Sequence, residues 1–400
     1  MWKYPKKRLW QCLVLKIKGR WISMSMGLYI HIPFCLKKCH YCDFLSFSLS
    51  NKKILYQYVY YINKEVKLWY KTADEKKIDT LYIGGGTPSL LPPHLLRKIM
   101  SVLSQHFSLD KNFEFTIEAN PGTLTYDSLK GYVGEGVNRI SLGVQSFDAA
   151  VLKKMGRTHG EKEVEESVVL SRKAGIRNLG FDLIYGLPEQ TLSQWENTLK
   201  KALEMEPEHV SVYGLSLENQ SLWALKKKKG ELFLPDQDTL ADMYFLSREI
   251  LLAHGYEHYE ISNFAKPGFR CRHNLKYWRL EPYIGIGLGA TSYIGKCRIN
   301  NFSSYDDYYK SLEKGELPFE TVEKLSLDQE MAEFMFLGLR TAEGVDEGEF
   351  FEKFEADMYQ VYGKEIKFLL EQGILWKRNG RIMLNPCYYP VANEVFLRFI

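Results

Sequence analysis

The sequence contains no run of 18 or more apolar residues, no repeat of fixed period and no low-complexity tract. A membrane-spanning helix needs about 20 mostly apolar residues, so the sequence predicts no such span. Stacked-repeat architectures are excluded because their units would show self-similarity at a fixed period. What remains is an ordinary globular composition, 45% hydrophobic and 26% charged over 400 residues. This length is sufficient for one large domain and a smaller one.

Acidic residues are missing from the start of the chain, where the first carboxylate is Asp43. Residues 1–26 carry seven basic side chains, and the net charge of +4 becomes −3 when these are removed. The net positive charge therefore comes from this leader and not from the rest of the chain, which argues against nucleic acid as a partner. Met24 and Met26 precede the first strand-like run, and only one Ser precedes Met24. These features favour an over-extended translation start over an organellar transit peptide.

Cysteine is scarce and unevenly placed: the chain has seven, and three of them crowd into one loop as C-x3-C-x2-C. An odd number without a secretory signal argues against a disulfide scaffold and predicts a reducing, cytoplasmic compartment. A [4Fe–4S] cluster on three cysteines leaves one iron open, whereas structural zinc needs four ligands, usually in two pairs. The spacing favours a cluster on Cys35, Cys39 and Cys42. Zinc completed by His40 or Asp43, and thiol chemistry, are the alternatives.

Six short apolar runs alternate with helical patterns along the first half of the chain. Such alternation predicts an α/β fold with a parallel sheet, which right-handed crossovers would curl into a partial, TIM-like (βα)6 barrel over residues 27–216. In barrels of this kind, the chemistry lies at the C-terminal ends of the strands. The predicted strands are Leu28–Ile32, Asp79–Gly86, Phe113–Asn120, Asn138–Gln145, Asn178–Gly186 and His209–Leu215.

The regular alternation stops after the sixth predicted strand. Residues 217–310 are expected to extend the core, and residues 311–326 to form a polar connection. Residues 327–400 contain two helical patterns, the second over Glu349–Gln372, followed by the hairpin sequence ILWKRNGRIML with a type I′ Asn-Gly turn. This order predicts a small winged-helix-like α+β domain. It has no dense basic recognition helix, so packing or partner contact is favoured over DNA binding.

Several motifs, in order along the chain, resemble those of the radical S-adenosylmethionine (SAM) superfamily. The three cysteines close the first βα unit, and GGGTP follows the second strand. Within that superfamily, the chain is similar to oxygen-independent coproporphyrinogen III oxidase and its relatives in LYIHIPFC, EANPGTLT, GVNRISLGVQSF, GFDLIYGLPEQT and HNLKYW. The resemblance implies that SAM binds the open iron and that one electron, from a cellular reductant, cleaves its sulfonium to give a 5′-deoxyadenosyl radical.

The resemblance also implies a SAM site at the strand ends. Gly85, Gly86 and Thr87 would present backbone groups to the methionine part of SAM, although three glycines also suit a tight turn. A single polar residue at a strand end is more often a satisfied structural group, but several together favour a ligand site. The further SAM positions that match the family are Tyr29, Tyr41, Glu118, Gln145, Arg157 and Asp182.

Two departures separate the chain from the oxidase. The oxidase has another cysteine two residues after the third, where Phe44 stands here, and a longer segment before the motif. Both departures fit the HemW-type heme chaperones, which keep three cysteines followed by CDF and carry an HNxxYW element, present here at residues 273–278. His273, expected on a loop, is therefore the candidate heme ligand. Cys271 is the alternative thiolate ligand, and a buried, hydrogen-bonded histidine is the structural alternative.

Two functions of different classes follow. The first is a heme chaperone that binds heme and transfers it to client hemoproteins. The second is a radical oxidoreductase acting on a porphyrinogen, although no coproporphyrinogen oxidase activity is expected and the catalytic residues are unknown. The resemblance implies heme, client hemoproteins and a reductant as partners. It leaves open whether the clients are membrane-associated and whether the chain forms a homodimer.

Overall fold

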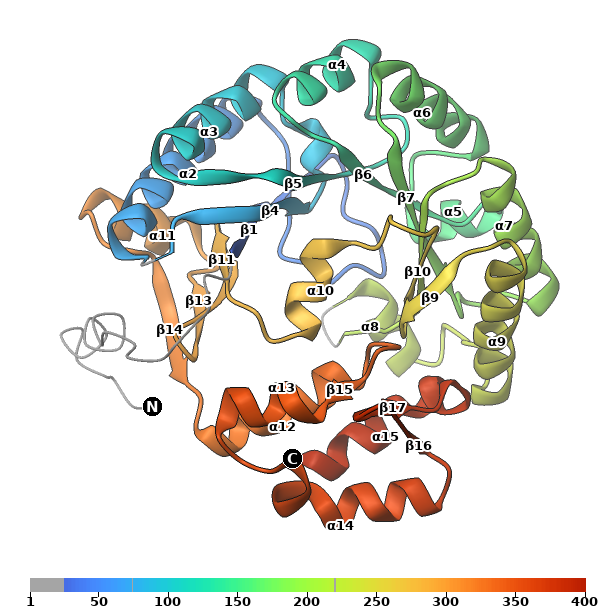
Figure 1. The fold of residues 1–400 in the computed structure, drawn as a ribbon. Helices are drawn as coiled ribbons and strands as arrows, with labels where there is room; N and C mark the ends of the chain where they lie inside the picture. The colour runs from blue at the N-terminus through green and yellow to red at the C-terminus, as the bar shows by residue number, and fades with distance from the viewer. Residues whose placement is uncertain (1–24, 74, 219–220) are drawn as a thin grey trace.

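The computed structural model describes residues 25–73, 75–218 and 221–400 (Figure 1). The expected basic leader, residues 1–26, lies outside the described residues apart from its last two positions. Among the residues that are described, no helix combines the length and the apolar character that a membrane crossing requires.

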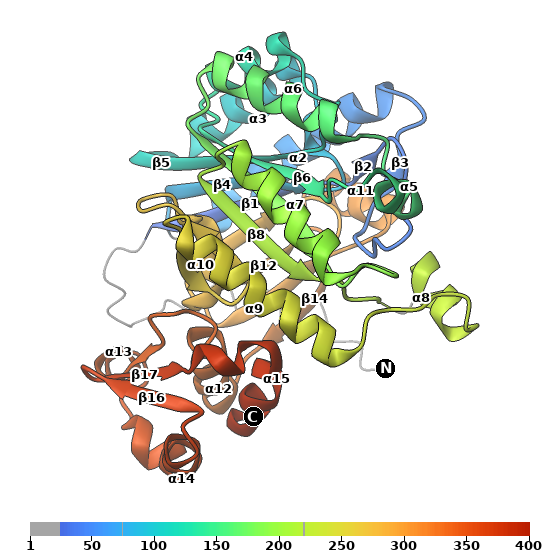
Figure 2. The same cartoon turned by 90° about the vertical axis from the view of Figure 1, so that its right-hand side faces the viewer.

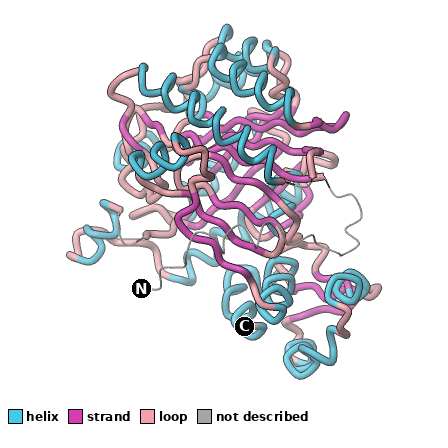
Figure 3. The backbone as a smooth tube through the Cα atoms, turned by 90° about the vertical axis from the view of Figure 1, so that its left-hand side faces the viewer, coloured by secondary structure: helices cyan, strands magenta, loops and turns pink. Residues whose placement is uncertain are grey.

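The six predicted strands form a continuous parallel sheet, as expected from their alternation with helices. Helices α2 (Lys53–Thr72), α3 (Pro93–His106), α4 (Tyr126–Gly134), α6 (Glu161–Ala174) and α7 (Leu192–Glu204) cover its outer face (Figures 1 and 3). The α/β prediction is therefore confirmed. In spatial order the parallel strands are β1 (Met26–Ile32), β4 (Lys77–Gly85), β5 (Ser108–Ala119), β6 (Arg139–Gln145), β7 (Asn178–Tyr185) and β8 (His209–Gly214).

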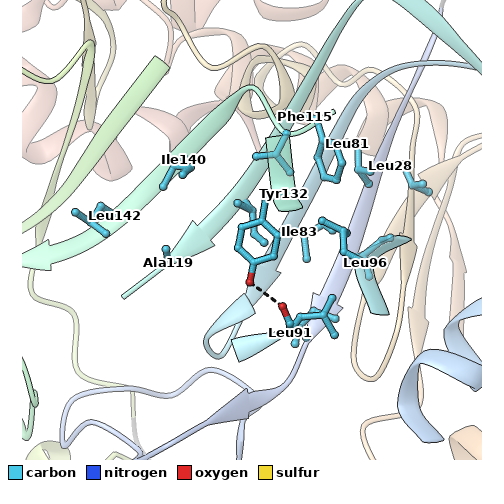
Figure 4. Packing of buried hydrophobic residues seen from close by; sticks show 14 of the residues in the cluster. Leu28, Leu81, Ile83, Leu91, Leu96, Phe115, Ala119, Tyr132, Ile140 and Leu142 are labelled. Atoms are coloured by element: carbon cyan, nitrogen blue, oxygen red, sulfur yellow. Dashed lines mark hydrogen bonds between the residues drawn. The ribbon is translucent and has the colours of Figure 1, made fainter. Parts of the chain in front are cut away.

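Alternation along these strands separates an apolar outer face from a polar inner one. Successive side chains of a strand point to opposite faces, so the buried Leu81, Phe115 and Ile140 all meet the helices (Figure 4). Tyr132 of α4 joins this layer and donates a hydrogen bond to the carbonyl of Leu91 (2.7 Å). Each fully buried aliphatic or aromatic side chain contributes about 1.5–3 kcal/mol. The opposite positions of the same strands are free to carry polar groups on the inside.

The segment after β8 extends the same sheet at both edges, giving twelve strands. On one edge β11 (Tyr283–Ile286) runs parallel to β1 and is followed by antiparallel β12 (Thr291–Ile294), β13 (Cys297–Asn301) and β14 (Phe319–Lys324). On the other edge β10 (Asn263–Ala265) and β9 (Glu257–Glu260) lie antiparallel beside β8. The helices of this segment are α8 (Leu222–Lys228), α9 (Gln237–Ala253), α10 (Arg272–Trp278) and α11 (Tyr305–Glu313), whereas the short α5 (Ala149–Met155) follows β6.

The expected polar connection over residues 311–326 is corrected by the structure. It contains the end of α11 and the whole of β14. Only Phe319 and Val322 of β14 pack against the core, while most of its other side chains are exposed. An edge strand needs few apolar residues because it is paired on one side only, so its sequence resembles that of a loop.

The C-terminal residues form a separate small core around a three-stranded sheet. The hairpin turn is confirmed by the positive φ of Asn379 (51°) and Gly380 (72°). The single helical pattern over Glu349–Gln372 is instead two helices, because Glu355 adopts a left-handed conformation (φ 53°) and Asp357 caps the next helix. The elements are α12 (Leu327–Gly338), β15 (Val345–Asp346), α13 (Glu347–Phe354), α14 (Met358–Glu371), β16 (Leu375–Arg378), β17 (Arg381–Leu384) and α15 (Ala392–Phe396).

Candidate functional site

Cys35 ends the short strand β2 (Phe34–Cys35), and Cys39 and Cys42 lie in the loop that leads from it to β3 (Phe47–Ser48), beside α5 (Figure 2). Backbone bonds close this loop: the amide of Phe47 donates to the carbonyl of Pro33 (2.7 Å) and that of Cys42 to the carbonyl of Cys39 (3.2 Å). All three thiols are partly exposed. Phe44, at the position of the oxidase's further cysteine, is 63% exposed.

A chain of polar side chains connects two of these thiols. Arg157 donates from Nη1 to the sulfur of Cys39 (3.5 Å) and from Nη2 to the amide oxygen of Asn120 (2.9 Å). Asn120 donates in turn to the hydroxyl of Thr87 (3.0 Å), which donates to the sulfur of Cys35 (3.5 Å). A guanidinium and a hydroxyl aimed at sulfur stabilise thiolate, which is the ligand form of cysteine.

The three thiols of the loop match in number the cysteines that hold a [4Fe–4S] cluster with one open iron. Within the described ranges, no three His, Cys, Asp or Glu residues lie close enough together to hold one metal ion. Ligands of a cubane bind different irons, so they stand farther apart than the ligands of one zinc. Burial raises the pKa of Cys42 to about 11, so its proton must leave when metal binds.

The end of β4 brings backbone groups close to the cysteine loop. Gly85 has φ +118°, a conformation that favours glycine. A side chain at Gly86 would meet the carbonyl oxygen of Phe34 at 2.7 Å and the sulfur of Cys35 at 2.9 Å. Gly86 therefore lets the end of β4 approach the cysteine loop closely, and the ring of His31 occupies the position where a Cβ of Gly85 would lie.

Two carboxylates of the predicted SAM site face each other across the inner side of the sheet. Glu118 accepts hydrogen bonds from the hydroxyl of Tyr82 (2.9 Å) and from the amide of Gly85 (3.1 Å). Asp182 accepts from the hydroxyl of Ser141 (3.1 Å). Burial, and then the charge of Asp182, raise the pKa of Glu118 to about 7, and burial also raises the pKa of Asp182. Paired carboxylates with raised pKa values favour a cationic ligand between them.

Gln145 and Arg157 meet at the end of β6. The space that a side chain on Gly143 would fill is bordered by Arg157 Nη2 (2.9 Å), Gln145 Nε2 (2.9 Å) and Asn120 Oδ1 (3.1 Å). Gln145 adopts φ 67°, which is uncommon outside glycine and often marks functional sites. The buried Nε of Arg157 has no hydrogen-bond partner in the described part of the chain. This group is well placed for an anionic ligand.

Of the two predicted tyrosines, Tyr29 lies on β1 and Tyr41 lies within the cysteine loop. The hydroxyl of Tyr29 donates to Nδ1 of His31 (2.9 Å), because Nε2 of that histidine donates to the carbonyl of Leu45 (2.9 Å). Burial raises the pKa of Tyr29. Tyr41 packs against Trp223 at a ring separation of 5.9 Å. The predicted SAM positions thus lie at one end of the sheet. Tyr41 also contacts α8 through Trp223.

His273 lies on α10 rather than on a loop, and it is fully buried. Its Nδ1 is hydrogen-bonded to the hydroxyl of Thr80 (2.9 Å) and its Nε2 to that of Tyr277 (2.8 Å). Burial lowers its pKa to about 3. Cys271 is also buried, and burial raises its pKa to about 12. In this conformation neither side chain presents a free atom to a heme iron.

Three polar residues that support the site were not predicted from the sequence. His31 packs beneath Gly85, Asn120 links Arg157 to Thr87, and Arg139 is buried on the inner face of the sheet. Nε and Nη1 of Arg139 have no hydrogen-bond partner among the described residues. Its charge lowers the pKa values of Glu118 and Asp182 against the effect of burial. The only signal in the sequence was a polar residue inside an apolar strand.

This sheet, with a three-cysteine loop at its C-terminal edge, defines a radical SAM protein. The family model of the Radical SAM superfamily matches residues 29–202, and that of the HemN C-terminal domain matches residues 325–386. The solved structure of coproporphyrinogen III oxidase (HemN) from Escherichia coli superposes with a TM-score of 0.85 over 99% of this chain and 93% of that one. At 22% identity this likeness shows the fold alone.

The relatives narrow the class to one family. Heme chaperone HemW from Lactococcus lactis is 39% identical over 93% of this chain and 96% of that protein. Heme chaperone HemW from Bacillus subtilis is 36% identical over 93% and 98%, and that from Escherichia coli is 41% identical over 66% and 69%. The chain belongs to the HemW family. The predicted resemblance is therefore confirmed, as is the preference for this family over the oxidase.

Proposed function

We propose that the protein is a heme chaperone, which binds heme and transfers it to client hemoproteins on a scaffold built for a [4Fe–4S] cluster and SAM. The observation that carries the proposal is the match over nearly the whole chain to relatives named as heme chaperones. The exposed Phe44 in place of a further cysteine supports the same choice.

The residues of the site fit both cofactors. Cys35, Cys39 and Cys42 would hold the cluster, which would supply one electron for cleavage of the SAM sulfonium. The backbone at the end of β4, residues 85–86, would contact the methionine part of SAM. The unpartnered Nε of Arg157 is suited to a carboxylate. The proposal includes a cellular reductant as a partner, which would reduce the cluster.

The two inner carboxylates would orient the rest of the ligand. Glu118 and Asp182 supply acceptors for ribose hydroxyls and negative charge for a sulfonium. The positive charge of the nearby Arg139 guanidinium lowers the pKa values of both carboxyls and so favours their ionised forms. Burial still outweighs this effect, so the pKa of Glu118 stays raised, at about 7, and this carboxyl titrates near neutral pH.

A radical oxidoreductase is the second candidate function, and the HemN-like fold is the observation that favours it. The fold alone does not specify a reaction. Coproporphyrinogen III is the substrate that would distinguish the two functions, because a chaperone would bind heme and leave this porphyrinogen unchanged.

One experiment tests both functions. Anaerobically reconstituted protein is given SAM, a reductant and coproporphyrinogen III, and the products are analysed. In parallel, heme-loaded protein is mixed with apomyoglobin, whose absorbance reports transfer. We expect heme binding and transfer without turnover. Formation of protoporphyrinogen, or failure to bind heme, would overturn the proposal.

The proposal also includes a cytoplasmic location, since an [4Fe–4S] cluster and free thiols need a reducing compartment. Membrane-associated clients and a homodimer remain predictions. Light scattering after size exclusion, with and without heme, would measure the mass of the particle. A mass of one chain in both states would contradict the homodimer.

A further inference from the structure

A groove beside the cysteine loop is not used by the SAM site. It lies between the last turn of α5 and the segment that contains α8, which Figure 2 shows on the same side of the sheet as the loop. Its cavity volume is about 410 Å³, within the range of about 300–1,000 Å³ for small-molecule sites. Its walls include His40, Lys153, Lys154, Trp223, Lys226 and Phe233.

His40 is held in this groove with one ring nitrogen committed. Its Nδ1 lies 2.8 Å from the carbonyl oxygen of Lys154. Because a carbonyl only accepts, Nδ1 carries the proton and Nε2 carries a lone pair. The backbone is fixed as well: the amide of His40 donates to the carbonyl of Met155 (3.0 Å), and the amide of Trp223 donates to the carbonyl of His40 (3.0 Å).

These bonds also serve a structural purpose, since they satisfy carbonyls at the end of α5. That purpose requires the backbone amide and Nδ1 of His40 but makes no use of Nε2. In the described part of the chain, Nε2 has no hydrogen bond. The ring packs against Gly156, where a Cβ would lie 3.2–3.4 Å from Nε2, Cδ2 and Cε1, so a side chain there would crowd the imidazole. A fixed imidazole with a free Nε2 is the usual form of a histidine metal ligand.

The other walls combine an aromatic surface with positive charge. Phe233 is 71% exposed, whereas Trp223 is buried at 3% and forms the floor. Three lysines face two glutamates across the groove, and one of these pairs, Lys154 with Glu189, is an ion pair. Lys153 and Lys226 then outnumber the remaining Glu231, so the groove keeps a net positive charge for an anionic ligand. A flat aromatic ring that carries carboxylates and a metal matches all of these features.

We propose that this groove binds heme, with Nε2 of His40 as an axial ligand of the iron and Lys153 and Lys226 near the propionates. The proposal rests on the heme-binding function proposed above and assigns it a site. When ferric heme binds, the lone pair of Nε2 forms the bond to iron and an axial water leaves. A neutral imidazole releases no proton in this step, and no electron is transferred.

The site has one structural consequence. His40 stands between Cys39 and Tyr41, so the loop that would hold the cluster would also hold the heme. Neither His273 nor Cys271 is required as a ligand, which agrees with their burial and internal hydrogen bonds.

The test replaces His40 by glutamine, whose amide can still donate to the carbonyl of Lys154. His94→Gln, at an exposed histidine on α3, is the matched control. Reconstituted protein is titrated with ferric heme, and the iron is examined by electron paramagnetic resonance, in which an oxidised cluster is silent. We expect the imidazole-ligated signal to disappear and heme affinity to fall at least about tenfold in His40→Gln only, or about 1.4 kcal/mol.

The outcomes separate this site from the function. If wild-type protein binds heme and His40→Gln keeps both signal and affinity, the site is wrong and the heme-binding function stands. The same conclusion follows if His273→Gln alone removes the signal. If wild-type protein binds no heme, the proposed function fails and the site fails with it. Circular dichroism and iron content show whether each variant is folded and carries its cluster.

A second arm tests the lysines. The double variant Lys153→Ala/Lys226→Ala is compared with Lys162→Ala/Lys367→Ala, which removes the same charge from exposed positions elsewhere. Each is titrated with ferric heme and with its dimethyl ester, which has no carboxylates. We expect the double variant to lose about tenfold in affinity for heme and nothing for the ester. Equal losses for both ligands, or equal losses in both variants, would overturn the assignment of the lysines.

Discussion

At the scale of single residues, Glu118 gives the site a distinct pH dependence. Its pKa of about 7 lies above the ordinary value of 4.5. The folded chain therefore binds the proton of the Glu118 carboxyl more tightly than the unfolded chain does. The stability that results is present below about pH 4.5 and is lost as the pH rises through about 7. In Glu118→Gln, we expect the unfolding free energy without SAM to change less between pH 5 and pH 8, by about 1–2 kcal/mol after allowing for solvent.

Denaturant unfolding followed by circular dichroism at both pH values measures this difference. Glu165→Gln, at an exposed position of α6, serves as control and should leave the pH dependence unchanged. An unchanged slope in Glu118→Gln would show that the carboxylate is ionised throughout. SAM binding should be weakened in the same variant, since the charge that opposes folding is the charge that would attract a sulfonium.

His273 provides a second prediction at this scale. With both ring nitrogens bonded and the side chain fully buried, His273→Ala leaves a cavity and two unpaired hydroxyls. We expect its unfolding free energy to fall by about 2–4 kcal/mol. The pKa of about 3 lies below the ordinary 6.5. The stability that wild type gains from this neutral histidine is therefore lost as the pH falls below about 6.5.

The midpoint of urea unfolding measures the loss, and His94→Ala should change it by less than about 0.5 kcal/mol. Heme titration of the same variant distinguishes the two roles of His273. An unchanged axial-ligand signal in a destabilised protein would assign the structural role. A lost signal with normal stability would instead support the original prediction of a heme ligand.

At the scale of elements, the sequence predicted the strands that apolar runs between helical patterns specify and the turns that glycines mark. Six apolar runs became six parallel strands because each buries one face against helices. β14 was missed because only Phe319 and Val322 reach the core, and the break at Glu355 was missed because no glycine marks it. His31 and Asn120 could not be identified, since their partners Leu45 and Arg157 are distant in sequence and only the fold brings them together.

The close approach between β4 and the cysteine loop allows a test at this scale. A methyl group in Gly86→Ala would contact the carbonyl of Phe34 and the sulfur of Cys35, so the loop would have to move. We expect the variant to fold but to hold less than half of the roughly four irons per chain that one cluster supplies. Gly134→Ala is the control, because its methyl would meet nothing within 4 Å and α4 would gain about 1 kcal/mol.

Iron and sulfide content after anaerobic reconstitution measures the effect of Gly86→Ala. Full cluster content in a folded variant would contradict the close approach seen between the loop and the strand end. Loss of content in the glycine control as well would point to general instability instead.

At the scale of the whole molecule, α10 connects the inner face of the sheet to the C-terminal unit. His273 lies at its inner end, and Trp278 at its outer end packs under the guanidinium of Arg340 (4.3 Å). Glu343 accepts from Arg270 (2.7 Å) and from Arg279 (3.2 Å) on either side of this helix. The C-terminal unit is thereby held against the element that carries the HNxxYW sequence.

Reversing the charge of Glu343 should loosen this attachment. Burial acts to raise its pKa, but the two arginines hold the pKa of Glu343 below its usual range. The ion pairs therefore stabilise docking above about pH 4.5 and lose this effect as the pH falls below it. Each half-exposed pair contributes less than about 1 kcal/mol, so Glu343→Lys, which also adds repulsion, should raise local opening several-fold. Hydrogen exchange of the amides in β15 and the end of α12 measures this opening at pH 7.

Glu352→Lys, at an exposed position of α13, is the matched control because it changes the charge of the same unit away from the arginines. The triple variant Arg270→Glu/Arg279→Glu/Glu343→Lys restores opposite charges and should recover part of the protection. If exchange rises only in the single variant, docking depends on these pairs. Ion pairs that contribute to docking would change the exchange rate measurably when they are lost. Equal exchange in wild type and Glu343→Lys would therefore mean that the apolar and cation–π contacts around Trp278 hold the C-terminal unit without the ion pairs of Glu343.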